Sequence, residues 1–278
     1  TNNWVKFGKE PKTECTYNGS IVLYFNGSSL ESVENESQCL SSKICKLGDQ
    51  YGVGETVTED FCTSQGGEWT NQNAKWSTST NIYWRIIRTN HDGSIRLLYV
   101  GTSHDTSIGN IGENTFNAYS TGSPKYVGYK YGEDTSLNTI RNNTTDSTIK
   151  TYIDTWYQNN LTNYTKYLST SAVYCNDRSE ETKGSYTTSN TRFNFASRKR
   201  LNTDKTPTYN CSNIKDAFSV DNTSAKLDYP IALMTADEIA FAGGVAYTRI
   251  GVQYAWFMSN NFGTDVSTSS WWFLSPIV

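Results

Sequence analysis

Residues 83–101 read YWRIIRTNHDGSIRLLYVG, and this stretch decides what kind of fold the chain can have. Two apolar runs, rich in β-branched and aromatic residues, flank the turn-forming segment Asn90-His91-Asp92-Gly93. Such runs on either side of an Asp-Gly turn predict a β-hairpin, with strands at residues 82–88 and 95–100. Arg85, Arg88 and Arg96 are expected to share its solvent face, and we favour a solvated strand face over an anion-binding site.

The clearest helical pattern covers residues 147–161. Apolar residues recur there at the helical repeat and form one stripe, and Asp146 or Ser147 is the expected N-cap. We interpret the stripe as part of the core rather than as a ligand site. Its members are Ile149, Ile153, Trp156 and Leu161.

A buried strand is predicted at Tyr229–Met234, followed directly by a short helix that ends near Gly243. Thr235 and Glu238 have the spacing of a capping box, which marks the beginning of a helix. Asp237 and Glu238 could be read as an acid–base pair. Because acidic residues in a first helical turn are favoured by the helix dipole, capping is the preferred explanation.

The composition describes a polar surface with little charge. The 278 residues include 18% charged and 14% aromatic side chains, and the formal net charge is −3. These values argue against nucleic acid as a partner. The sequence lacks the roughly 18 consecutive apolar residues of a membrane span, so no direct span is expected in this chain.

Six cysteines indicate three disulfides in an oxidising compartment. With only two histidines and no closely spaced cysteine pair, no metal site is predicted, and no cofactor motif is present. The positions favour a Cys175–Cys211 bond and two bonds within the first 62 residues. The basic segment between Cys175 and Cys211 is interpreted as a solvated loop.

Two domains are expected. Residues 1–80, rich in Gly, Ser and Asn, are predicted to be a disulfide-stapled subdomain with a short strand at residues 21–25 and otherwise irregular chain, followed by a mixed α+β domain at 81–278. The apolar run Trp271–Leu274 predicts a buried strand so near the last residue that we expect further protein to follow it. Because Thr1 is not an initiator Met, further protein is also expected before it.

Five blocks give the chain a resemblance to uncharacterised surface proteins of gut Firmicutes and Mollicutes that often carry a prepilin-like membrane helix. The blocks are YWRIIRTNHDGSIRLLYVG, STIKTYIDTWYQNNL, VYCNDRS, YPIALMTADEIAFAGG and WWFLSP. Their order also resembles the C-type-lectin-like fold of formylglycine-generating-enzyme relatives, which implies that fold for residues 81–278. The chain departs from those relatives in lacking the Glu-Pro-Asn, Gln-Pro-Asp and Trp-Asn-Asp motifs and the catalytic cysteines.

Together these observations predict an extracellular, cell-surface ligand-binding module, an adhesin or pilus-associated protein whose C-terminal face is one candidate for diversification. No nucleophile, phosphate-binding loop or metalloprotease motif is present, so catalysis is not expected. A filament subunit that binds copies of itself and a glycan-active enzyme are the alternatives. The residues expected to bind a glycan or protein ligand are Tyr254, Trp256, Asn260, Asn261, Phe262 and Asp265.

Overall fold

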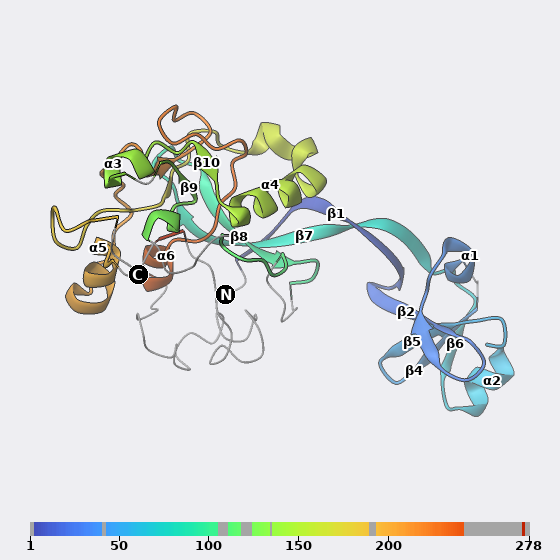
Figure 1. The fold of residues 1–278 in the computed structure, drawn as a ribbon. Helices are drawn as coiled ribbons and strands as arrows, with labels where there is room; N and C mark the ends of the chain where they lie inside the picture. Colours follow the sequence, from blue (N-terminus) through green and yellow to red (C-terminus); the bar gives the residue numbers. More distant parts are fainter. Residues whose placement is uncertain are drawn as a thin grey trace. The chain divides into compact units, whose positions relative to one another are not determined.

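The structure, a computed structural model, describes residues 3–40, 43–104, 111–117, 124–133, 135–188, 193–241 and 274–275. It is a mixed α+β structure with a mostly sheet core, few short helices and three disulfides. The chain forms two compact units (Figure 1). The small unit is Lys9–Asn81, and the large unit combines Thr1–Gly8 with Ile82–Val278. Two long strands, β1 (Trp4–Tyr17) and β7 (Lys75–Thr89), run from one unit into the other.

The small unit is built from several short strands. The strand predicted at residues 21–25 is confirmed, but the prediction of irregular chain for the rest was wrong. Its elements are β2 (Ser20–Phe25), β3 (Leu30–Ser32), α1 (Glu36–Cys39), β4 (Ile44–Leu47), β5 (Gln50–Val53), α2 (Glu59–Ser64) and β6 (Glu68–Thr70). Strand β2 pairs with β5 in parallel and with β3 antiparallel, and β4 pairs antiparallel with β5 and β6. Disulfides Cys15–Cys39 and Cys45–Cys62 stabilise the unit, whose apolar core is small.

The large unit contains the predicted hairpin, formed by β7 and β8 (Ile95–Gly101). Residues Arg85 and Leu98 face each other across the ladder, and the amide of Asn90 donates to the carbonyl of Ser94, 2.7 Å away, to close the turn. Gly93 has φ 83°, a left-handed conformation that glycine adopts without strain. The beginning of β1 pairs with β7 on the side away from β8.

Helix α4 (Thr148–Asn160) confirms the predicted helix within one residue at each end. The Ser147 hydroxyl caps it by accepting a hydrogen bond from the amide of Lys150. Ile149 and Ile153 are buried as expected, whereas Trp156 is only half-buried. A 3-10 helix, η2 (Thr162–Tyr167), follows.

Helix α6 (Ala236–Phe241) also begins where the sequence predicted. The amide of Thr235 donates to the Glu238 carboxylate at 2.9 Å, and the amide of Glu238 donates to the Thr235 hydroxyl at 3.1 Å. This reciprocal pair is the expected capping box. The remaining short elements are η1 (Pro124–Tyr126), β9 (Lys130–Tyr131), α3 (Leu137–Ile140), β10 (Thr145–Asp146), β11 (Tyr174–Cys175), α5 (Ala196–Arg198), η3 (Lys199–Asp204) and β12 (Ala217–Phe218).

The strand predicted at residues 229–234 is not present. Its carbonyl groups have partners other than a neighbouring strand. The Arg96 guanidinium donates to the carbonyls of Ala232 and Leu233, and the amide N–H of Leu274 donates to the carbonyl of Met234. Pro230 has no amide hydrogen to offer a ladder. An apolar run alone therefore did not identify a strand here.

No helix in the described part of the chain is long and apolar enough to cross a membrane.

Candidate functional site

The described part of the large unit contains a cavity of about 1390 Å³. Its walls come from the beginning of β1, the β7–β8 hairpin, helices α4 and η2, and the extended segment 230–234. Among the described residues, eight with aromatic side chains line it, and we call this feature the aromatic groove. They are Phe7, Trp84, Tyr99, Tyr152, Trp156, Tyr164, Tyr167 and Tyr174.

The inner part of the aromatic groove is a rigid cluster of three rings. Tyr99 lies edge-to-face with Trp84 and with Trp156, at centroid distances of 5.6 and 5.2 Å. The indole N–H of Trp84 donates to the carbonyl of Phe7 at 2.6 Å, which fixes the ring. Edge-to-face contacts of this kind hold aromatic side chains in one arrangement. Helix α4 lies beside the hairpin, so residues far apart in sequence build this cluster (Figure 1).

The outer part of the groove is more accessible. Phe7 contacts Tyr164 and Tyr167 edge-to-face at 5.6 and 6.4 Å, and Tyr167 is 66% exposed. Tyr164 and Tyr167 are three residues apart on a 3-10 helix, where side chains at that spacing lie on one face. Their rings are therefore placed where a ligand could contact them.

At one end of the groove, the carboxylate of Asp92 connects the hairpin turn to the loop that follows η2. Asp92, in the hairpin turn, accepts hydrogen bonds from the hydroxyls of Ser94, Ser169 and Ser171. The bond from Ser169, with those from Ser94 and Ser171, lowers the pKa of Asp92. Because the carboxylate stays ionised, the turn remains attached to the loop that follows η2.

The groove carries little net charge. Among the residues that the structure describes, its charged lining residues are Lys6, Arg96 and Glu113, and Arg96 is already paired. Arg88 and Arg96 both donate to one oxygen of Glu238, at 3.0 and 3.2 Å. Burial favours the neutral acid, but the charges of Arg96 and Arg88 and the Thr235 amide outweigh it and lower the pKa of Glu238. A neutral ligand suits such walls better than a charged one.

The expected solvent face for the hairpin arginines was wrong. Arg85 and Arg96 are 8% and 7% exposed, and the guanidinium of Arg85 lies 3.8 Å from the centroid of the Trp4 ring. The side chain of Arg88 is 16% exposed and covers the ring of Tyr209. The guanidinium groups therefore contact aromatic rings and Glu238, where the sequence pattern predicted contact with solvent.

A second charged cluster surrounds Lys150, whose side chain is 0% exposed. Its ammonium donates to Asp146, Asp154 and Asp228 at 3.1, 2.5 and 2.6 Å. The three carboxylates lie within 4.8 Å of one another, a spacing that a metal ion could use, but here they converge on an internal cation. Burial alone would lower the pKa of Lys150, yet the bonds to Asp154 and Asp228 raise it. The cluster therefore stabilises the unit and offers no free nucleophile.

A third cluster is more deeply buried. Asp216, with its side chain 1% exposed, accepts from Arg178 at 2.7 Å and from Arg141 at 3.0 Å. Arg178 is fully buried and also donates to Asn143 and to the carbonyls of Lys130 and Lys215. Its burial and its bonds to Asp216, Asn143 and two carbonyl groups indicate a structural role.

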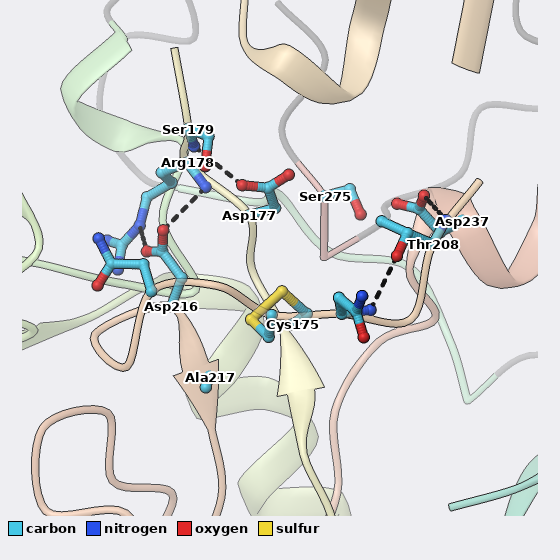
Figure 2. The surroundings of a disulfide bond; sticks show 12 residues. Cys175, Asp177, Arg178, Ser179, Thr208, Asp216, Ala217, Asp237 and Ser275 are labelled. Carbon is cyan, nitrogen blue, oxygen red and sulfur yellow. Dashed lines mark hydrogen bonds and ion pairs between the residues drawn. A yellow bond between two sulfur atoms is a disulfide. The ribbon is translucent and has the colours of Figure 1, made fainter. Parts of the chain in front are cut away.

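The Cys175–Cys211 bond is present, with a Cα–Cα distance of 5.6 Å. Arg178 and Asp216 lie to one side of the bridge, and Thr208 and Asp237 to the other (Figure 2). The loop that it closes includes Arg200, which donates to Asp177 at 2.7 Å and to Asp237 at 2.8 Å. The basic segment is thus partly bound to α6 and not only a solvated loop.

Replacing both Cys175 and Cys211 by Ser is expected to lower the free energy of unfolding by about 2–4 kcal/mol, because the bond closes a loop of 36 residues. Urea unfolding of the variant under oxidising conditions measures the loss. Because a reductant would also break Cys15–Cys39 and Cys45–Cys62, the double variant isolates the loss at this loop. An unchanged unfolding midpoint of the variant would show that the loop is held without the bond.

The six residues predicted to bind ligand, at positions 254, 256, 260, 261, 262 and 265, lie outside the described residues. Sequence reasoning also placed Trp156 in the core and overlooked η2. The sequence does contain a sign of this 3-10 helix. In Asn163-Tyr164-Thr165-Lys166-Tyr167 the two tyrosines are three residues apart, the spacing that places them on one face of such a helix. The contribution of Phe7 could not be anticipated, because it depends on the first residues returning to the large unit.

Comparison with protein-family models, with curated proteins and with solved structures finds no match to this chain.

Proposed function

We propose that this chain is an extracellular ligand-binding module and that the aromatic groove is its binding site. The observation that carries the proposal is a cavity of about 1390 Å³ whose walls combine rigid aromatic side chains with few charges. Ligand sites in proteins are concave and mostly apolar, with a small number of polar groups that fix orientation. Asn90, Ser94 and Ser169 supply such groups at one end of the groove.

Three disulfides support an oxidising, extracellular location. The finer parts of the proposal are that residues 81–278 have a C-type-lectin-like arrangement and that the module serves a cell-surface adhesin or pilus-associated protein. The resemblance of the five sequence blocks supports these parts. A filament subunit and a glycan-active enzyme are the alternatives that the same experiments address.

Tyr167→Ala is expected to weaken ligand binding at least tenfold and to leave the unfolding midpoint unchanged, because the ring is 66% exposed and lies along the groove. The probes are an array of mucin and plant oligosaccharides and a library of synthetic peptides, with affinities measured by fluorescence polarisation. Tyr209→Ala, another exposed tyrosine that does not line the groove, is the control. If no probe binds, or if both variants bind like the wild-type protein, the groove is not the site.

A further inference from the structure

We infer that the aromatic groove takes an extended polypeptide segment that adds a strand to the outer edge of β8. This inference rests on the proposed function and names the class of ligand. Three properties of the groove lead to it: how β8 lines the cavity, how the main chain of β8 is bonded, and what size and charge the cavity has.

The lining of the groove follows β8 residue by residue. Every position from Gly93 to Tyr99 contributes to it. Successive side chains of a strand point to opposite faces of the sheet. A cavity that meets only the side chains of one face would be lined by alternate residues, so lining by successive residues indicates that this cavity also meets the main chain of β8. Ile95, at the beginning of β8, is 47% exposed.

The main chain of β8 has partners on one side among the described residues. Strand β8 is the last in the sheet order and pairs with β7. In an antiparallel ribbon, alternate residues direct their N–H and C=O groups away from the partner strand. Within the part of the chain that the structure describes, the backbone of Ile95, Leu97 and Leu98 makes no hydrogen bond outside the hairpin. An added strand would satisfy those of these groups that point away from β7.

The size and chemistry of the groove fit an extended, uncharged segment. A volume of about 1390 Å³ exceeds the roughly 300–1,000 Å³ of common small-molecule sites. Lys6 and Glu113 have opposite charges, and Arg96 is paired with Glu238, so the walls attract no particular ionic ligand. Large apolar side chains at alternate positions of the segment would contact the aromatic rings. A glycan would present more hydroxyl groups than these apolar walls can bind.

The test uses the full chain and a synthetic library of eight-residue peptides in which apolar residues alternate with Thr. The tightest binder is made again in two forms, with backbone N-methyl groups at odd or at even positions. Alternate residues of an added strand direct their N–H groups toward β8, so the N-methyl groups block these hydrogen bonds in only one of the two forms. We expect that form to bind about 10- to 100-fold more weakly than the parent peptide and the other form to bind within a few-fold of it. Equal binding or equal loss in both forms would overturn strand addition.

Matched protein variants test the same edge. Ile95→Lys is expected to weaken peptide binding about tenfold, because a charge on an edge strand opposes strand pairing. Ile214→Lys, at a position that is 64% exposed and outside the groove, should bind normally. Hydrogen exchange of the Leu97 and Leu98 amides should slow in at least one of them when peptide is added. Full protection in the free protein would show that the edge is already covered, and would refute the inference.

The outcomes separate this inference from the proposed function. If an oligosaccharide binds in a Tyr167-dependent way and no peptide does, the groove remains the binding site and strand addition fails. If a peptide binds in a Tyr167-dependent way but N-methylation has no register-specific effect, the ligand class is right and the mode is wrong. If neither peptides nor oligosaccharides bind, both proposals fail.

Discussion

Asp216→Asn is expected to lower the free energy of unfolding of the large unit by about 3–5 kcal/mol. The carboxylate is bonded to Arg178, which is fully buried, and to Arg141, whose side chain is 9% exposed. Burial lowers the pKa of Arg178, and the charge of Asp216 is the main force against that change. Removing the negative charge leaves two buried guanidinium groups without a counterion, and each must then be solvated by protein dipoles alone.

Urea unfolding at neutral pH measures the effect, with Asp204→Asn as a matched control. Asp204 makes the same type of ion pair, with Lys199, but its side chain is 39% exposed, so its loss should cost below about 1 kcal/mol. The double variant Arg178→Met/Asp216→Asn should be less destabilised than the sum of the two single variants. Asp216→Asn alone leaves both Arg178 and Arg141 without their counterion, whereas the double variant leaves only Arg141. Strict additivity, or equal effects at positions 204 and 216, would contradict the assigned role of this cluster.

The features that the sequence predicted correctly depend on residues close together in the chain. The hairpin is determined by apolar runs around Asn90-His91-Asp92-Gly93, and α4 by an apolar stripe with a serine cap. The capping box of α6 spans four residues. The physical cause is a turn conformation, a helical repeat or a cap. Each of these acts within a few residues, so it can be recognised in the local sequence.

The features that the sequence did not reveal depend on distant partners. Arg96 is buried because Glu238, 142 positions away, neutralises it. Apart from β2, the short strands of the small unit have too few residues to show a strand pattern. The parallel pairing of β2 with β5 spans an intervening helix. Two of the three carboxylates around Lys150 lie four residues on either side of it in the sequence, at Asp146 and Asp154, whereas nothing in the sequence links Asp228 to them.

Lys150→Met is expected to destabilise the large unit by about 3–5 kcal/mol at pH 7, toward the lower end of that range. The ammonium of Lys150 is buried among three carboxylates, and without it they repel one another. Two of them reach solvent, with side chains 34% and 53% exposed for Asp146 and Asp228, and water will screen part of the repulsion. Lys183→Met, at an exposed position, is the matched control.

The loss should depend on pH, and its sign follows from the carboxyl pKa values. In the wild-type protein the hydrogen bond from Lys150 lowers the pKa of Asp228, so its contribution to stability is present above the unfolded pKa of about 3.9 and is lost as the pH falls through its lower folded pKa. In the variant, repulsion raises the carboxyl pKa values above the unfolded value, so stability is regained as the pH falls through them.

Asp154 should take up a proton first, because burial already raises its pKa although Lys150 opposes this. The difference in unfolding free energy between wild type and Lys150→Met should therefore narrow from pH 7 to pH 4, while the Lys183→Met difference stays constant. Urea unfolding across this range measures both. If the difference between wild type and Lys150→Met in unfolding free energy stays constant or widens on acidification, the three carboxylates do not repel one another in the variant. The ammonium of Lys150 would then not be the group that allows them to lie so close together.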